Sequence, residues 1–114
     1  MNTGYEIKNG SLYFNGDIFL KIEHPIIDFL IVEEAIILLL NYNSQYKDRN
    51  IFGYDFEGKP IWQIAQPDKF HDTNYFVYIS LKENRVFAYN INGVEVTINP
   101  STGEMLSKEL IKWN

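Results

Sequence analysis

Two histidines are the side chains in this sequence best suited to acid–base chemistry near neutral pH. His24 precedes a proline at the expected end of a strand, and His71 stands between Asp68 and Asp72 in a polar segment. The carboxylates of this segment, together with His71, could bind a hard divalent cation. A metal site needs several ligands that converge in space, however, and aspartates in loops usually cap turns. We therefore predict no metal site and no cofactor.

Other groups that could do chemistry lack the context that their chemistry needs. The chain has no cysteine, which excludes a thiol nucleophile, a thiolate metal site and a disulfide framework. None of its five serines lies in a Gly-x-Ser-x-Gly nucleophile elbow, and no glycine-rich loop leads into a helix to bind phosphate. Glu33 and Glu34 are adjacent, so on a strand they point to opposite sides and cannot share a proton. Asp55 and Glu57 fall in an expected turn, and we predict that the protein is not an enzyme.

Composition assigns the chain to the class of small globular domains. Its 114 residues are 46% hydrophobic, 16% aromatic and 22% charged, which suits one domain over residues 1–114 and excludes a disordered chain. The net charge of -5 argues against nucleic-acid binding, which needs clustered lysines and arginines. Residues 1–34 hold six acidic and two basic side chains, so a basic partner is favoured electrostatically. The start of the sequence does not resemble a secretion signal, and we expect a cytoplasmic protein.

The most apolar stretch of the chain, residues 26–40, raises the question of a membrane span. A transmembrane helix needs about 20 mostly apolar residues, whereas this stretch is shorter and contains three acidic residues. We therefore predict no membrane segment. Many β-branched residues and the lack of a polar stripe favour two buried strands, 26–32 and 35–41, that reverse at Glu33 and Glu34. The alternative is a single helix that starts at the preceding proline.

Turn signals divide the rest of the chain into short extended runs. Asn-Gly at residues 15–16 and 92–93 is the strongest short signal for a β-hairpin, because both turn residues need a positive φ. Segments 55–58 and 99–103 carry the Asp, Pro and Gly residues typical of turns, and 82–84 makes another short reversal. The sequence therefore predicts an all-β, antiparallel meander of about ten short strands. A propeller-like and a sandwich-like arrangement are both compatible with these turns.

The second Asn-Gly turn also predicts a register. A two-residue loop at 92–93 would pair Tyr89 with Val96 and Phe87 with Ile98 on one apolar face of the sheet. The other face would carry mostly polar side chains, as in a sheet with one solvated side. These four apolar residues are therefore predicted to lie in the core.

Residues 50–64 contain a motif that resembles the repeat of quinoprotein-type β-propellers. In that repeat a strand ends in Ala-x-Asp, turns through Thr-Gly and leads to a tryptophan four residues past the glycine. Asp55, Gly58 and Trp62 match it, although the threonine is missing and the turn is one residue shorter. A second copy at 99–103 has Asn in place of Asp, and a serine falls where the tryptophan would lie. The resemblance implies a hairpin device without redox chemistry, because the family's activity needs a whole propeller and a bound quinone, for which this chain is too short.

Over its whole length the sequence resembles a wider group of standalone bacterial proteins of uncharacterised function. The shared features are small size, acidity, a pair of apolar strands, an Asn-rich loop, a Tyr-Asp turn that leads to Trp-Gln-Ile, and a Thr-Gly hairpin. Some proteins of this kind resemble immunity proteins, which neutralise a cognate toxin. The resemblance implies a shared fold. Together with the small size, the acidity and the lack of catalytic motifs, it leads us to expect another protein, such as a basic toxin, as the partner.

Two polar loops that contain aromatic residues, 42–50 and 66–74, form the candidate binding surface. Exposed tyrosines flanked by charges suit a protein interface, because they supply contact area at a low entropic cost. The alternative is that the rings fold back and cover the ends of the sheet. The candidate partner-binding residues are Tyr42, Tyr46, Asp48, Asp68, Phe70 and Asp72.

These observations lead us to expect a non-catalytic protein-binding module, an immunity-like inhibitor that occludes a basic partner. Two alternatives stay open. Unprotected sheet edges could pair with a second copy, which would make the protein a self-associating assembly module and a homodimer. A cavity within the sheets could instead bind a small molecule.

Overall fold

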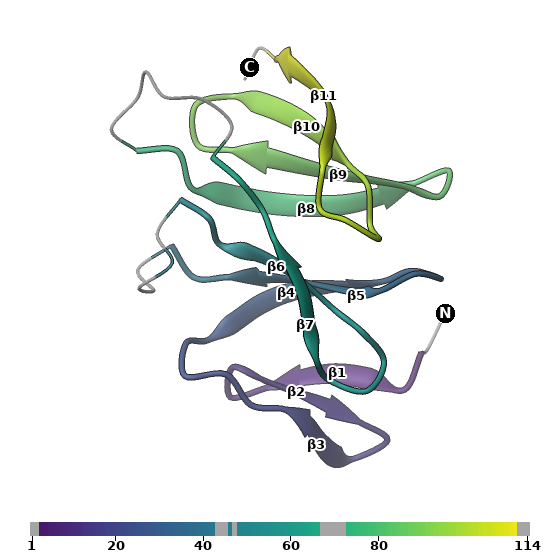
Figure 1. The fold of residues 1–114 in the computed structure, drawn as a ribbon. Helices are drawn as coiled ribbons and strands as arrows, with labels where there is room; N and C mark the ends of the chain where they lie inside the picture. The colour runs from purple at the N-terminus through teal and green to yellow at the C-terminus, as the bar shows by residue number, and fades with distance from the viewer. Residues whose placement is uncertain (1–2, 43–45, 47, 67–72, 112–114) are drawn as a thin grey trace.

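The strands of this chain are short, and each follows the last after a tight turn or a loop. The computed structural model describes residues 3–42, 46, 48–66 and 73–111, and within them it contains eleven strands and no helix. The strands, shown in Figure 1, are β1 (Tyr5–Lys8), β2 (Ser11–Phe14), β3 (Asp17–Leu20), β4 (Ile26–Ile31), β5 (Ile36–Leu40), β6 (Ile51–Tyr54), β7 (Pro60–Gln63), β8 (Phe76–Lys82), β9 (Arg85–Asn90), β10 (Val94–Ile98) and β11 (Met105–Leu110).

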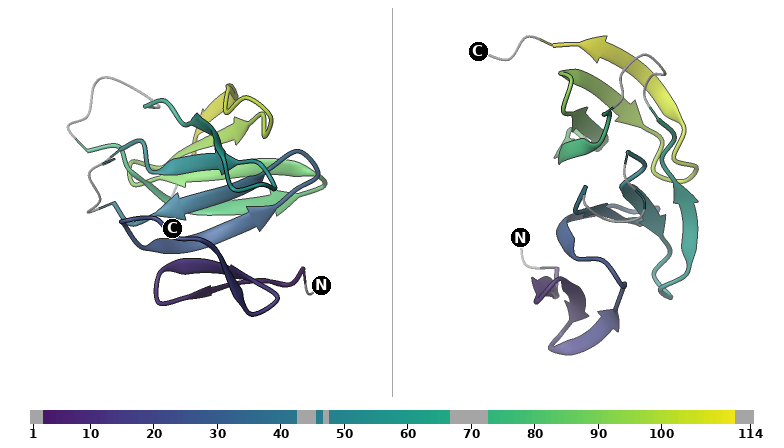
Figure 2. Two further views of the ribbon diagram at one scale, coloured as in Figure 1. Left: turned by 60° about the horizontal axis from the view of Figure 1, so that its bottom comes forward. Right: turned by 90° about the vertical axis from the view of Figure 1, so that its left-hand side faces the viewer.

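The strands form three antiparallel sheets, each built from consecutive strands. The orders are β1-β2-β3 in the N-terminal sheet, β4-β5-β6-β7 in the central sheet and β11-β10-β9-β8 in the C-terminal sheet. The central sheet lies between the other two (Figures 1 and 2). The all-β meander predicted from the sequence is confirmed. None of the described residues belongs to a helix with the length and apolar character that crossing a membrane requires.

The apolar segment 26–40 forms two strands, as predicted, because its side chains pack on both faces of the central sheet. β4 and β5 pair antiparallel, and the chain reverses between them at Glu33 and Glu34, which are exposed. All five residues of β5 are buried. A strand that is covered on both sides needs apolar residues at every position. This explains why the segment shows neither an alternating pattern nor a polar stripe.

Two apolar cores lie on the two sides of the central sheet. The core toward the C-terminal sheet receives Ile37 and Leu39 from β5, and the core toward the N-terminal sheet receives the alternate residues Ile36, Leu38 and Leu40. Both cores therefore contain side chains of β5, and this one strand of the central sheet packs toward the sheets on both sides. The further buried members of the first core are Ile51, Trp62, Ile64, Phe76, Ile79, Val86, Ala88, Val96 and Ile98.

Two-residue turns with a left-handed backbone join several strand pairs. Asn15 and Gly16 have φ values of 51° and 89° and connect β2 to β3, as predicted. Asn9 and Gly10, with φ values of 51° and 77°, make the same kind of turn between β1 and β2. Our expectations from the sequence did not include this turn, although its Asn-Gly signal is the same.

The hairpin of β9 and β10 corrects the predicted turn at Asn92-Gly93. The loop between the strands has three residues, 91–93, and Gly93 alone among them has a positive φ, at 81°. The side chain of Asn90 explains the longer loop, because its Oδ1 accepts the backbone N–H groups of Asn92 at 3.0 Å and of Val94 at 2.9 Å. An asparagine side chain that bonds to the backbone ahead of it stabilises such an irregular turn.

The longer loop shifts the register by one residue and exchanges the two faces of β9. Val96 and Ile98 are buried, as predicted, but they lie opposite Ala88 and Val86. The prediction that Phe87 belongs to the core is wrong, because this side chain is only partly buried and points to the other face of the sheet.

The turn between β8 and β9 holds a glutamate in an unfavourable conformation. Glu83 has a φ of 51°, a left-handed value that glycine and asparagine adopt more easily. We expect Glu83→Asn to raise the free energy of unfolding by about 0.5–1 kcal/mol. Urea unfolding checks this value, with Glu34→Asn, at an exposed turn position without positive φ, as the control. A loss of stability in Glu83→Asn would contradict the prediction.

Candidate functional site

The two predicted binding loops leave the sheets at the same end of the molecule (Figures 1 and 2). Hydrogen bonds join the described residues on their flanks. Gln66 Nε2 donates to Asp48 Oδ2 at 3.2 Å, and Gln63 Nε2 donates to the carbonyl of Arg49 at 2.9 Å. Arg49 Nε in turn donates to the carbonyl of Ile64 at 2.9 Å. The term loop end is used below for the described residues within 41–50, 64–66, 73–75 and 91–93.

A buried asparagine holds the base of the loop end. Asn50 is fully buried, and its Nδ2 donates to the carbonyls of Leu40 and Phe76, each at 2.9 Å. Its Oδ1 accepts the backbone N–H of Phe76 at 2.9 Å. The side-chain amide therefore acts as a strand partner for the start of β8, and it links the central sheet to the C-terminal sheet at this end.

The turn between β9 and β10 is fixed at the same end by further asparagines. Asn92 Nδ2 donates to the carbonyl of Thr73 at 2.6 Å and to Oδ1 of the buried Asn74 at 3.0 Å. The backbone N–H of Ile91 donates to the carbonyl of Tyr75 at 2.9 Å. These bonds tie the segment before β8 to the β9–β10 turn. They therefore hold residues 73–75 and 91–93 of the loop end together.

Tyr42 is the most prominent aromatic side chain of the loop end. It is 49% exposed, and its ring stacks on that of Tyr75 with a centroid distance of 4.3 Å and an interplanar angle of 18°. Tyr75 is itself only partly exposed. The stacked partner restricts the orientation of Tyr42, so its outer face is presented to solvent in a defined position.

Tyr46, in contrast, folds back onto the protein. Its ring contacts that of Phe52 at a centroid distance of 4.8 Å and that of His24 at 5.5 Å, both edge to face. It packs against the core between the central and N-terminal sheets. The two interpretations made from the sequence therefore apply to different residues: Tyr42 is presented at the surface, and Tyr46 covers the end of a sheet.

Three of the six predicted site residues, Tyr42, Tyr46 and Asp48, belong to the described part of the loop end, where each contacts a different partner. Asp68, Phe70 and Asp72, together with His71, lie outside the described residues. Two members of the surface were missed from the sequence: Tyr75, which supports Tyr42, and Ile91, which is 43% exposed. An aromatic residue directly after a polar loop is a usable signal for Tyr75, whereas the two-residue loop predicted at 92–93 places Ile91 in a strand.

Comparison with known families adds one finding to this geometry. Residues 2–110 match the family described as Domain of unknown function (DUF7957). The chain belongs to this family. The matched region includes all the described strands, so this DUF7957 domain comprises the three sheets together. No curated protein matches the chain.

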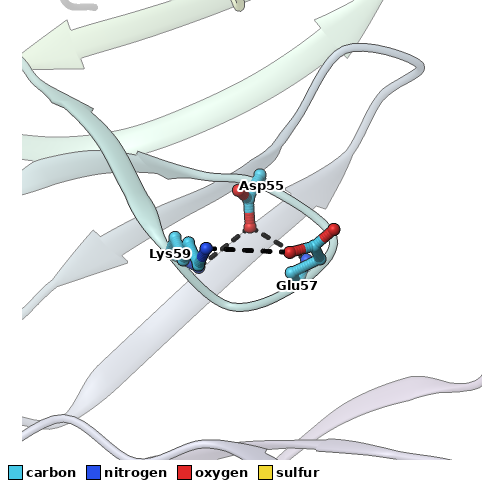
Figure 3. Close-up of polar contacts among 3 residues, drawn as sticks. All are labelled: Asp55, Glu57 and Lys59. Carbon is cyan, nitrogen blue, oxygen red and sulfur yellow. Dashed lines mark hydrogen bonds and ion pairs between the residues drawn. The ribbon is translucent and has the colours of Figure 1, made fainter.

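In this DUF7957 chain the turn after β6 contains Asp55 and Gly58 of the propeller-like motif, and the side chain of Asp55 forms the hydrogen bonds expected of that motif (Figure 3). Asp55 Oδ1 accepts the backbone N–H groups of Glu57 and Lys59, each at 2.9 Å, and Gly58 has a φ of 86°. The ammonium of Lys59 lies 3.9 Å from the carboxylate of Glu57, an exposed ion pair that contributes little to stability. The second copy of the motif is similar, because Asn99 Oδ1 accepts the N–H of Ser101 at 2.9 Å.

Trp62 joins the two copies of the motif. Its Nε1 donates to the carbonyl of Pro100, in the second turn, at 2.7 Å. The indole packs against the backbone of Gly53 and Gly103, where an added Cβ atom would meet its ring atoms. The two hairpin turns, which are far apart in the sequence, are thus fixed relative to one another by one side chain.

Among the described residues of this DUF7957 chain there is no group of three or more His, Asp and Glu side chains that could hold a metal ion. Burial raises the pKa of Tyr54 and of Tyr89, and a hydrogen bond with Glu95 raises the pKa of Tyr89 further, so both hydroxyls are neutral near pH 7. Tyr89 is buried, as predicted from the sequence, but on the outer face of the C-terminal sheet.

Proposed function

We propose that this chain is a non-catalytic protein-binding module that covers a basic surface of its partner with the loop end, as an immunity-like inhibitor would. The observation that carries the proposal is the exposed ring of Tyr42, held in place by Tyr75. Tyrosines fixed before binding are effective anchors, because little side-chain entropy is lost when they meet a partner. The hydrogen bonds from Gln66 to Asp48 and from Asn92 to the carbonyl of Thr73 restrict the neighbouring segments of the loop end.

The charge of the chain supports a basic partner. The net charge is -5, and residues 1–34 hold six of the acidic side chains. Glu23 is exposed and adjoins His24, whose ring contacts Tyr46, so acidic charge lies next to the loop end. Acidic groups around an aromatic anchor accelerate association with a basic protein. A chain without cysteine needs no oxidising compartment for its fold, so the proposed activity is compatible with the cytoplasm.

A self-associating assembly module is the second candidate, and the edge strand β11 favours it. β11 pairs with β10 on one side, and Leu106 and Leu110 are 58% and 80% exposed. Lys108 lies between these leucines, and a charged residue in the middle of an edge strand opposes pairing with a second copy. We therefore rank this function second, and light scattering of the purified protein tests it.

Site-specific crosslinking tests the proposed interface. A photoreactive phenylalanine analogue at position 42 should crosslink to a basic partner protein in cells of the organism of origin. The same analogue at Phe56, which is 43% exposed at the tip of a distant turn, is the matched control and should give no such product. Crosslinking of the partner from Phe56 and not from Tyr42 would overturn the proposed interface.

Once the partner is identified, its affinity measures the weight of the anchor. We expect Tyr42→Ala to weaken binding by about thirtyfold or more, since truncation of an aromatic anchor at a hot spot costs about 2 kcal/mol or more. Association should also slow as salt concentration rises, because the acidic charge of the chain steers the encounter. An affinity that is unchanged in Tyr42→Ala would contradict the proposal.

A further inference from the structure

A groove of about 400 Å³ lies on the C-terminal sheet where β9, β10 and β11 meet, near the β8–β9 turn. This turn lies at the opposite end of the sheet from the loop end (Figure 1). The volume falls in the range of sites for small organic ligands, about 300–1,000 Å³. This groove is termed the Arg85 groove, and its lining residues are Asn84, Arg85, Thr97, Ile98, Pro100, Leu106 and Ser107.

One wall of the Arg85 groove is apolar and fixed in place. Pro100 belongs to the turn after β10, and its carbonyl accepts the hydrogen bond from Trp62 Nε1 at 2.7 Å. The same turn is closed by the N–H of Gly103, which donates to the carbonyl of Asn99 at 2.7 Å. Because the wall is formed before a ligand arrives, binding does not require this turn to be ordered.

Arg85, the cation beside the groove, takes part in no ion pair within the described part of the chain. Arg85 lies directly opposite Lys82 in the β8–β9 pair, and like charges in this position destabilise a sheet. The ion pairs of Lys8 with Glu6 and of Lys59 with Glu57 involve neither of these two cations. The ammonium of Lys82 lies 6.0 Å from the centre of the Phe87 ring. The guanidinium of Arg85 is therefore the group that an anion in the groove would meet.

Two hydroxyl groups lie in the groove beside this cation. Ser107 Oγ donates a hydrogen bond to Thr97 Oγ1 at 2.8 Å. Thr97 accepts in this bond, so its own hydroxyl proton can be donated to a ligand. Arginine with a neighbouring hydroxyl donor is a typical set for a carboxylate, whose two oxygens accept several hydrogen bonds.

We propose that the Arg85 groove binds a carboxylate that carries a short aliphatic group. The carboxylate meets Arg85 and Thr97, and the aliphatic group packs against Pro100 and Leu106. A free carboxylic acid and the C-terminal residue of a peptide share this chemistry. The site is separate from the loop end, so a ligand here and a protein partner there do not exclude one another.

A titration followed by amide chemical shifts in NMR tests the proposal. Hexanoate should shift the amides of Arg85, Thr97 and Ser107 in a saturable way, whereas hexanol, which has the same chain without the charge, should bind far more weakly. A peptide that ends in leucine is compared with its C-terminal amide. Binding of the peptide acid that is tighter than that of hexanoate identifies a chain terminus as the source of the carboxylate, and the reverse order identifies a small acid.

The variants separate the charge from the fold. We expect Arg85→Gln to weaken hexanoate binding by about tenfold, because a hydrogen bond to a charged group is lost. Arg85 is exposed, so this variant should keep the spectrum of a folded protein outside the groove. Lys21→Gln, an exposed cation between β3 and β4, is the control and should bind like the unchanged protein. Equal shifts with hexanol and hexanoate, the absence of shifts in the groove, or unchanged binding in Arg85→Gln would overturn the proposal.

Discussion

Replacing Asn50 with leucine is expected to lower the free energy of unfolding by at least about 3 kcal/mol. Leucine has nearly the same size, but it cannot make the bonds of Asn50 to the carbonyls of Leu40 and Phe76 and to the N–H of Phe76. Each buried polar group left without a partner costs about 1–3 kcal/mol. Small domains are stable by about 5–15 kcal/mol in total, so the variant should lose a large part of its stability.

Urea unfolding followed by circular dichroism measures this loss. Gln63→Ala is the matched control, because it removes one exposed hydrogen bond from a side-chain amide to the carbonyl of Arg49 and should cost less than about 1 kcal/mol. If Asn50→Leu unfolds at the same urea concentration as the unchanged protein, the amide does not hold the central and C-terminal sheets together.

Asn50→Asp separates the hydrogen bonds from the size of the side chain. It keeps an acceptor for the N–H of Phe76, but an ionised carboxylate cannot donate to the two carbonyls. Burial would raise the pKa of this carboxyl in the folded state above its unfolded value of about 4. The folded state then holds the proton to higher pH, so the variant should be most stable below about pH 4 and lose stability as the pH rises toward neutrality.

The fold class could be predicted from short sequence signals, because most of the turns are stabilised by residues within the turn itself. Asn15-Gly16 has the left-handed backbone that its residue types favour, and Asp55 accepts the backbone bonds of its own turn. The apolar composition of β5 predicted a buried strand, but it did not show why every position of that strand is apolar. A strand covered on both faces and a buried helix have the same apolar pattern in a sequence, and only the stacking of a sheet on each side distinguishes them.

The register of β9 and β10 could not be obtained in the same way. The signal at Asn92-Gly93 predicted a two-residue loop, whereas the side chain of Asn90 bonds ahead of itself and lengthens the loop to three. One added residue exchanges the two faces of a strand, so Phe87 was assigned to the wrong side. A side chain that competes for backbone hydrogen bonds is hard to weigh against an Asn-Gly signal from sequence alone.

The composition of the polar loops predicted the candidate site, but it did not show which of its aromatic residues are exposed and which are packed. Tyr42 and Tyr46 are both tyrosines of one polar loop, and nothing local distinguishes them. Their different environments depend on contacts with residues distant in the sequence, since Tyr42 stacks on Tyr75, whereas Tyr46 contacts His24 as well as the nearby Phe52. Long-range contacts of this kind decide which residues of a loop are exposed to solvent.

Replacing Gly53 with alanine is expected to lower the free energy of unfolding by about 2–4 kcal/mol. An added Cβ atom at Gly53 would lie 2.7 Å from Cζ2 of Trp62 and closer still to two other indole atoms. The indole cannot move away easily, because it also packs against Gly103 and its Nε1 donates to the carbonyl of Pro100. The variant must therefore displace a core side chain and weaken the bond that joins the two hairpin turns.

A double-mutant cycle distinguishes this clash from an effect of the backbone. In a Trp62→Leu background the indole is absent, so Gly53→Ala should cost less than about 1 kcal/mol, because alanine suits an extended strand at least as well as glycine. Gly16→Ala provides a control for backbone strain alone, since Gly16 has a φ of 89° and no atom within 4 Å of an added Cβ. That control should cost about 1–2 kcal/mol in either background. Equal costs of Gly53→Ala with and without Trp62 would show that the indole does not confine this position, and the link between the two turns would then have to be assigned to other contacts.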